Sequence, residues 1–308
     1  MELEEIRRAL VYSEIIACMR DALIANSRGE CDTPMPMHLQ VGQALGLSEV
    51  HIKSSYRRGG RYFALKLAST FPGNLARGLP TGNGMMLLFS AETGEPVAFL
   101  ADAGHLTDVR TAAAAAMVAR ELGRRDSTLG LIGTGIQARL EALMHAEVLP
   151  LERIVLWGRT PERAEQCRSD LESQLPHVKV SLASSPAEVA RNARLLVTVT
   201  AARQPLLFAS DLQPGTHISA VGSDSPGKQE LDPEILKSAS LILADSRRQC
   251  EKLGELQHAP AEWVRAVEIG EFCQAPGSPP DGITVADFTG LGVEDLYIAE
   301  YCYERSVK

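Results

Sequence analysis

A glycine-rich turn at residues 133–138 limits most strongly what this chain can fold into. The short apolar stretch STLGLIG leads into the turn, and IQARLEALMHAEV, which begins within it, has the apolar spacing of a helix. The turn reads Gly133, Thr134, Gly135, Ile136, Gln137 and Ala138, a GxGxxA pattern. The pattern alone is weak, but between a strand and a helix such glycines let backbone N–H groups approach a pyrophosphate. We therefore predict a dinucleotide site formed by residues 133–137.

Strand and helix patterns alternate through the region after Arg125. The strand-like stretches RIVLWG, VKVSLA, ARLLVTVT, THISAVG and SLILAD are mostly separated by helical ones, which indicates a parallel sheet. Residues 51–100 differ, because HIKSSY, RYFALKLAS, GMMLLFS and PVAFL are separated by short turns such as AETGE, as in an antiparallel meander. We predict an α/β protein with a Rossmann-type doubly wound parallel sheet domain and a smaller α+β domain that has an antiparallel sheet.

The helical tail DLYIAEYCYER follows the last strand pattern. We expect it to pack back on the antiparallel domain, which is then discontinuous. The predicted domains are residues 1–118 with 290–308, and residues 119–289 for the dinucleotide-binding domain.

Composition excludes several other classes of protein. The 308 residues carry a net charge of −8, which disfavours binding to nucleic acid or to an anionic membrane. The six cysteines form no CxxC pair and the seven histidines show no HxxxH spacing, so we expect neither a metal site nor a disulfide framework. The acidic N-terminus is unlike a signal peptide, and no apolar run reaches the roughly 20 residues that span a bilayer. A cytoplasmic protein is expected.

The strand after the glycine turn indicates which dinucleotide is preferred. RIVLWG leads into Arg159 and Thr160, and no carboxylate appears before Glu162. An acid there would bind a ribose 2′-hydroxyl, whereas Arg159 and Thr160, helped by Arg163, can bind a 2′-phosphate. We predict NADP(H), although Arg159 could also be a surface residue at the start of a helix. Further predicted cofactor contacts follow the later strands: Thr198, Val221, Gly222 and Ser223.

Asp224 lies in the loop VGSDSPGKQEL, just past a predicted strand of the parallel sheet. Ligands of open α/β sheets bind at that edge, so a carboxylate there is a candidate for chemistry. A solvated turn with ordinary polar residues is the other interpretation.

Five stretches together resemble the ornithine cyclodeaminase/mu-crystallin family. They are FALKLASTFPGN, LTDVRTAAAAAMVA, LGLIGTGIQA, HISAVGSDSPGKQELD and TGLGVEDL, which stand in the order of the family between about residues 60 and 297. The resemblance implies an NAD(P)-dependent amino-acid dehydrogenase or ketimine reductase. It also implies a homodimer that pairs through the antiparallel domains, which bind substrate, and an active site beside the nicotinamide.

The resemblance also assigns roles to individual residues. Lys66 matches the family's active-site lysine near the substrate carboxylate, and Arg110 matches the arginine that grips this carboxylate. Thr81 falls where the family has a polar group facing cofactor and substrate, and Asp224 matches the carboxylate of the catalytic loop. Arg110 could instead pair with Asp108.

Two departures from the pattern of the cyclodeaminases disfavour cyclisation of ornithine. Their further carboxylate-binding arginine is missing from CDTPMPMHLQ, where Lys53 is a possible substitute or else an exposed strand lysine. Cyclodeaminases also tend to have an acidic residue where Arg159 stands.

The residue types fit oxidation of an amino acid at Cα. A hydride can leave Cα only when the nitrogen lone pair is free, so a base such as Asp224 has to take a proton from the amino group. Lys66 and Arg110 can fix the carboxylate in the orientation that the reaction needs. We predict NADP-dependent oxidative deamination of a basic amino acid such as L-arginine to its 2-oxo acid. Ammonia elimination of the ornithine cyclodeaminase type, reduction of a cyclic ketimine, and a non-catalytic mu-crystallin-like NADPH-binding protein are the alternatives.

Overall fold

The computed structural model describes residues 1–41, 48–263, 265–275, 277 and 280–307. The chain divides into two compact units, one formed by Met1–Arg110 with Leu291–Lys308 and the other by Thr111–Gly290. The division falls inside helix α3 (His105–Glu121).

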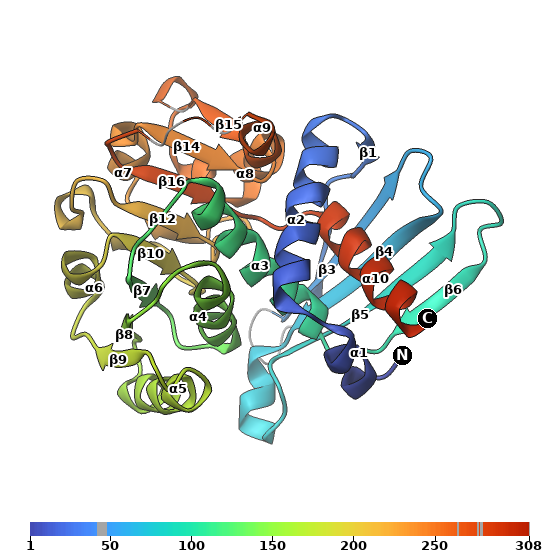
Figure 1. Ribbon diagram of the computed structural model, residues 1–308, viewed down its shortest axis with the longest axis horizontal. Coiled ribbons are helices and arrows are strands. Elements are labelled where there is room, and N and C mark those ends of the chain that lie inside the picture. The colour runs from blue at the N-terminus through green and yellow to red at the C-terminus, as the bar shows by residue number, and fades with distance from the viewer. Residues whose placement is uncertain (42–47, 264, 276, 278–279, 308) are drawn as a thin grey trace. The chain divides into compact units, whose positions relative to one another are not determined.

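The first unit is built on an antiparallel sheet (Figure 1). Its strands lie in the order β1 (Cys31–Asp32), β3 (Ser48–Arg57), β4 (Tyr62–Thr70), β5 (Gly82–Ser90) and β6 (Pro96–Leu100), and β2 (Met37–Val41) also pairs with β3. The predicted meander of four strands, β3 to β6, is confirmed. The pattern missed β1 and β2, because two prolines lie between them and the residues of β2 are exposed rather than alternating in burial.

Helices cover one face of this sheet. Helix α10 (Gly292–Ser306) packs on β3, β4 and β5, and α2 (Tyr12–Ser27) packs against α10 (Figure 1). The short helix α1 (Leu3–Ala9) also contacts α10, and a 3-10 helix (Pro72–Arg77) connects β4 to β5. The C-terminal helix is therefore part of the core of this unit.

The opposite face of the antiparallel sheet is apolar and partly exposed. Leu65, Leu87 and Phe99 are direct cross-strand neighbours on β4, β5 and β6. Leu65 is 37% exposed and Phe99 is 49% exposed. A second row on the same face pairs Phe63 with Phe89, whose rings stack with centroids 4.9 Å apart. Such an apolar surface is typical of an interaction face.

The second unit contains the predicted Rossmann-type sheet, which is thereby confirmed. Its eight described strands are all parallel, in the order β15 (Ala266–Glu268), β14 (Leu241–Ala244), β16 (Thr284–Asp287), β12 (His217–Ala220), β10 (Leu195–Thr198), β7 (Thr128–Ile132), β8 (Arg153–Trp157) and β9 (Lys179–Leu182). The prediction missed β15 and β16. A separate pair, β11 (Arg203–Leu207) and β13 (Gln229–Leu231), lies outside this sheet.

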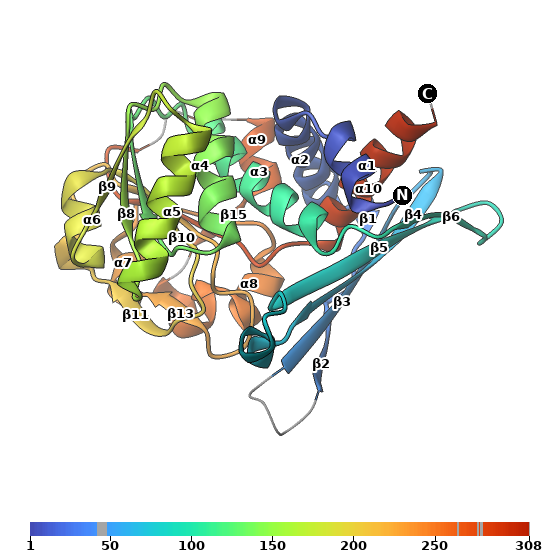
Figure 2. The same cartoon turned by 90° about the horizontal axis from the view of Figure 1, so that it is seen from below.

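Helices connect the parallel strands of this unit. They are α4 (Ile136–Val148), α5 (Pro161–Gln174), α6 (Pro186–Asn192), α7 (Pro233–Ser238), α8 (Arg247–Leu253) and α9 (Ile269–Gln274). Figure 2 shows α4 and α5 side by side, where they pack on β7 and β8. Gly130 of β7 lets α6 approach the sheet, because a Cβ there would lie 2.7 Å from Val189 Cγ1.

The strand order positions the glycine turn. From β7 the chain continues to β8 and β9 on one side, and then returns to β10 and β12 on the other. Such a reversal opens a crevice at the carboxyl ends of the strands, where open α/β sheets bind ligands. In the described part of the chain, no helix is both long and apolar enough to cross a membrane.

Candidate active site

The glycine turn follows β7 and leads directly into α4. Gly133 has a φ of 129°, and a Cβ there would lie 2.7 Å from Val199 Cγ2, so a larger residue would be strained. A Cβ on Gly135 would instead meet nothing within 4 Å, so packing does not explain this glycine. The open space over Gly135 and the N-terminal N–H groups of α4 fit the pyrophosphate of a dinucleotide.

Two residues that the sequence analysis missed shape this turn. Arg139 donates from Nη1 to the carbonyl oxygens of Thr134 and Gly135 at 2.8 and 3.0 Å, and is anchored by Asp170 of α5. Gly158, after β8, makes room for Thr134, because a Cβ there would lie 2.3 Å from Thr134 Cγ2. The turn is therefore held from α4, α5 and β8.

The residues predicted to select the dinucleotide lie after β8. Arg159 and Arg163 are exposed, and neither forms an ion pair within the described ranges. Thr160 directly precedes α5, which begins with Pro161. The alternative of a surface arginine before a helix is thus compatible with the structure, and so is a free guanidinium at the carboxyl end of β8.

Asp224 lies four residues after β12 and is partly exposed. Its Oδ1 lies 2.5 Å from Lys228 Nζ and accepts a hydrogen bond of 3.1 Å from Ser225 Oγ. Gln257 braces the loop, since its Oε1 accepts from Gly227 N at 2.9 Å. Asp224 is therefore a hydrogen-bonded side chain at the carboxyl edge of the sheet, with a lysine beside it.

A buried carboxylate, Glu230, ties this loop to the end of β10. It accepts hydrogen bonds from Thr198 Oγ1, from the N–H and hydroxyl of Thr200, and from Gly222 N, at 2.6–2.9 Å. A Cβ on Gly222 would lie 2.6 Å from Glu230 Oε2. A larger residue at position 222 would therefore collide with the Glu230 carboxylate. The hydroxyl of Thr198 points at Glu230. Burial raises the pKa of Glu230, and the same hydrogen bonds oppose this rise.

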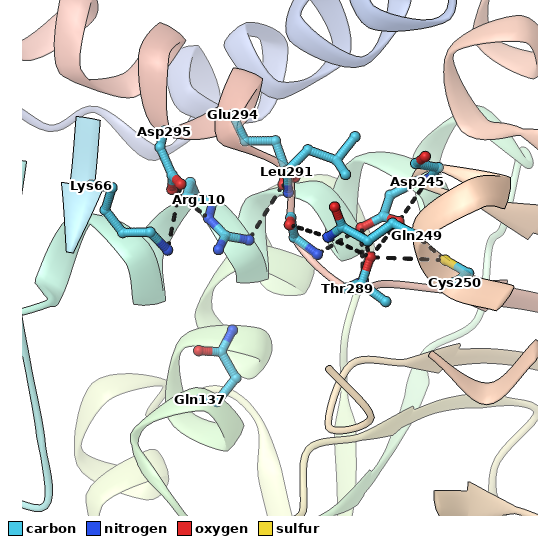
Figure 3. A network of polar contacts seen from close by, with 12 residues as sticks. Lys66, Arg110, Gln137, Asp245, Gln249, Cys250, Thr289, Leu291, Glu294 and Asp295 are labelled. Atoms are coloured by element: carbon cyan, nitrogen blue, oxygen red, sulfur yellow. Dashed lines mark hydrogen bonds and ion pairs between the residues drawn. The ribbon is translucent and has the colours of Figure 1, made fainter. Parts of the chain in front are cut away.

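More buried carboxylates continue this arrangement along the same sheet edge. Glu255 accepts from Glu230 N at 2.8 Å, and Asp287 accepts from Glu255 N at 3.0 Å. Asp245 accepts from Thr289 N and Gly290 N at 2.7 and 2.6 Å (Figure 3). Burial raises the pKa of Asp287 to about 7 and that of Glu255 well above its usual range. These acids connect the loops that follow β12, β16 and β14.

The other predicted cofactor contacts, Val221 and Ser223, belong to the same loop. Val221 N donates to Thr198 O at 2.9 Å, and Ser223 is buried and donates from Oγ to Lys228 O at 2.9 Å. Both residues fix the shape of the loop.

The antiparallel unit buries three cations together. Lys53 of β3 and Lys66 of β4 are direct cross-strand partners on the face covered by α10, and their exposed fractions are 7% and 2%. The interpretation of Lys53 as an exposed lysine is therefore wrong. Arg110 is 4% exposed and lies inside α3.

Two acids of α10 compensate these cations. Arg110 donates from Nε to Asp295 Oδ1 at 3.1 Å and from Nη1 to Glu294 Oε2 at 3.3 Å. Lys66 Nζ lies 3.4 Å from Asp295 Oδ2, and Figure 3 shows these side chains pointing toward one another. Burial lowers the pKa of Lys66, while Asp295 opposes this change. Burial raises the pKa of Asp295, but Lys66, Arg110 and Lys53 together hold it below its usual range.

The structure does not place Thr81 beside Lys53 and Lys66. It precedes β5 by one residue, whereas the β5 neighbour of Lys66 is Met86. At about 3.3 Å per residue, five positions along the strand correspond to roughly 16 Å. A substrate carboxylate bound at Lys66 would therefore not lie beside Thr81, and the predicted contact of Thr81 with substrate gains no support.

The sequence analysis assigned no role to the residues that support the predicted ones: Arg139, Lys228, Glu230, Glu294 and Asp295. The stretches GKQELD and TGLGVEDL contain four of these, so their charged residues were the available signal. Within the described residues, no group of three His, Cys, Asp or Glu side chains could hold a metal ion.

A Rossmann sheet with an open glycine turn at its switch point, together with a unit that buries a cation cluster, defines a dinucleotide-binding protein of two units. Comparisons place it more narrowly. All residues 1–308 match the model of the ornithine cyclodeaminase/mu-crystallin family.

Relatives and solved structures agree with this match. An alanine dehydrogenase of Archaeoglobus fulgidus is 33% identical over 315 residues, covering 99% of this chain and 94% of its own. A Delta(1)-pyrroline-2-carboxylate reductase of Bacillus cereus is 31% identical over 314 residues, covering 99% and 95%. The structure of an archaeal alanine dehydrogenase dimer with bound NAD has a TM-score of 0.90 and 30% identity, covering 100% of this chain and 95% of that one.

The chain belongs to the ornithine cyclodeaminase/mu-crystallin family, as its motifs predicted. It is an NAD(P)-dependent oxidoreductase of the branch that acts on amino or imino acids.

Proposed function

We propose that this enzyme oxidatively deaminates an L-amino acid with NADP, with Lys66 and Arg110 binding the α-carboxylate and Asp224 exchanging the proton of the amino group. The observation that carries the proposal is the buried cation cluster formed by Lys53, Lys66 and Arg110. Cations are costly to bury, and Asp295 and Glu294 of α10 pair with Lys66 and Arg110. Binding of a small anion explains why such a cluster exists.

The residues divide the work by their chemistry. The nicotinamide, when bound, supplies the redox chemistry. Lys66 and Arg110 fix the carboxylate and thereby orient Cα, and Asp224 holds or releases the proton at the substrate nitrogen. Lys228 Nζ lies 2.5 Å from Asp224 Oδ1 and holds this carboxylate in place. The glycine turn and α4 bind the pyrophosphate.

A basic amino acid, L-arginine first, is the proposed substrate. The support is the net charge of −8 and the likeness of the Asp224 loop to that of dehydrogenase and cyclodeaminase members. A panel of L-amino acids assayed with NADP, with formation of NADPH followed at 340 nm and ammonia measured separately, tests this proposal. Ammonia released without net NADPH would indicate the cyclodeaminase reaction instead.

Reduction of a cyclic imino acid is the second candidate. The relative named Delta(1)-pyrroline-2-carboxylate reductase favours it, because the same cations and the same acid would serve the reverse reaction. Oxidation of NADPH by a cyclic imino acid, with no activity on linear amino acids, would select this candidate.

Replacement of Arg159 by alanine should weaken NADP binding and leave NAD binding nearly unchanged. One charge-assisted contact contributes roughly 1.5–3 kcal/mol, or about 10- to 150-fold in affinity. Titration of the two dinucleotides measures the difference. Arg168→Ala, on the helix α5 that follows Arg159 but paired with Glu165 and Glu172, is the matched control and should change neither affinity. An equal loss for both dinucleotides would remove Arg159 from recognition of the 2′-phosphate.

We propose that the apolar face of the antiparallel sheet pairs two copies of the chain, as the related alanine dehydrogenase is a dimer. Leu65→Glu would place a charge among Leu87, Phe99 and their symmetry mates. Sedimentation should then change from dimer to monomer, because an unpaired charge in an apolar interface is costly. Leu75→Glu, on an exposed residue of the 3-10 helix, is the control. A dimer retained by Leu65→Glu would place the interface elsewhere.

A further inference from the structure

The two buried lysines create an electrostatic problem that the proposed function does not solve by itself. Lys53 and Lys66 are directly opposite each other on adjacent strands, where like charges are destabilising. Arg110 adds a third positive charge. When no substrate is bound, a stable fold therefore needs an anion of the protein itself beside Lys53, Lys66 and Arg110.

Helix α10 supplies that anion at a fixed position. A Cβ on Gly292 would lie 2.4 Å from Ser54 O, so glycine lets the first turn of the helix approach the backbone of β3. Glu294 Oε2 accepts from Leu291 N at 2.6 Å and closes this turn. Asp295 then reaches both cations, with Oδ1 at 3.1 Å from Arg110 Nε and Oδ2 at 3.4 Å from Lys66 Nζ (Figure 3).

We infer that Asp295 is the positioning residue of the cation cluster: its carboxylate is the internal counterion that holds Lys66 and Arg110 side by side, so that the substrate carboxylate binds as a second anion. The last clause rests on the proposed function, whereas the counterion role does not. Asp295 belongs to the GVEDL stretch, which the proposed reaction leaves without a role.

The charge state of Lys66 depends on all the groups that surround it. They are Lys53 from β3, Arg110 and Asp108 from α3, and Glu294 and Asp295 from α10, while β5 contributes the neutral Met86. Asp102, ahead of α3, interacts with Asp108 and Asp295. Asp295 has the largest effect among the charges that raise the pKa of Lys66.

The first test is the pH profile of kcat/KM for Asp295→Asn. Without the counterion the pKa of Lys66 falls further, so the alkaline limb should move down by at least one pH unit, or about tenfold in kcat/KM at a fixed pH on that limb. The loss should lie mainly in KM, with kcat within about threefold at lower pH. Asp295→Glu keeps the charge and should restore the limb. Glu294→Gln removes the smaller of the two acidic contributions to the pKa of Lys66, since Glu294 contacts Arg110, and should move the limb by less than Asp295→Asn does.

The second test is urea unfolding against pH without substrate. Lys66 has a folded pKa below its unfolded one, so the unfolded chain binds more protons between the two values and stability rises with pH there. In Asp295→Asn this rise should begin at lower pH. The depressed pKa of Asp295 also gives stability that is lost as pH falls through its folded pKa, and this loss should be absent from the variant.

The outcomes separate the inference from the proposed function. The counterion role is overturned if the stability of Asp295→Asn depends on pH as that of the wild type does. It is also overturned if the alkaline limb of kcat/KM does not move. If the wild type turns over no amino or imino acid, the proposed function fails and the unfolding series alone decides. If Asp295→Asn does not fold, the double variant Lys66→Met/Asp295→Asn should recover folding, and its failure to do so contradicts the inference.

Discussion

Asp224→Asn should lower kcat by about 10²- to 10⁴-fold, the range for loss of a general acid or base. Asparagine has nearly the same shape and can keep the bond from Ser225, but it cannot take a proton at neutral pH. Binding of NADP and of substrate should therefore stay within a few-fold. The profile of kcat against pH should also lose one limb. Steady-state kinetics across pH, with dinucleotide titrations, measure both effects.

Asp232→Asn is the matched control for this variant. Asp232 lies eight residues further along and caps α7 through Glu234 N at 3.0 Å, a role that asparagine also fills. The control should keep the wild-type rate and profile. A near-normal kcat with an unchanged profile for Asp224→Asn would show that Asp224 only orients the substrate.

Lys66→Met and Arg110→Met should each lower kcat/KM by about 30- to 5,000-fold. Truncation of one partner in a buried, hydrogen-bonded charge pair costs about 2–5 kcal/mol, and each 1.4 kcal/mol is tenfold. Binding of NADP should remain intact, because the glycine turn and Arg159 belong to the other unit. The comparison of kcat/KM for an amino acid and for its amide, which lacks the carboxylate, isolates the contact.

The amide is the decisive substrate for these variants. With Lys66→Met or Arg110→Met, kcat/KM for the amide should fall little, because the amide has no carboxylate for these cations to bind. If the amide and the amino acid react equally well with the wild type, neither cation binds the carboxylate. Lys53→Ala should have a smaller effect, and a neutral result would leave Lys53 as a structural member of the cation cluster.

Local patterns were sufficient for much of the fold. The glycine turn required a strand before it and a helix after it, and the structure has β7 and α4 there. Short strand-type runs separated by turn residues in residues 51–100 predicted the antiparallel strands, because neighbouring strands joined by short turns pair in an antiparallel meander. Strands β15 and β16 were missed, since both are short and the residues around them are rich in proline and glycine.

The candidate site was predictable only in part. Lys66, Arg110 and Asp224 were found because they stand in recognisable motifs, but the sequence left their partners open. Asp108 was the partner of Arg110 that the sequence suggested, and the structure adds Glu294 and Asp295, which lie 184 and 185 positions away in the chain. Lys53 could be buried or exposed, and only its register opposite Lys66 decided this.

Features that depend on neighbouring residues were predictable from the sequence: the periodicity of the elements, the glycine turn, the absence of an acid after β8 and the family motifs. The tertiary structure alone decided which charges meet, because Lys53, Lys66, Arg110 and Asp295 come from four separate elements. It also decided that Glu230 lies beneath Gly222 and ties two strand ends together. Such contacts depend on sheet register and helix packing, since a change of one residue in register would turn every side chain of a strand to the other face.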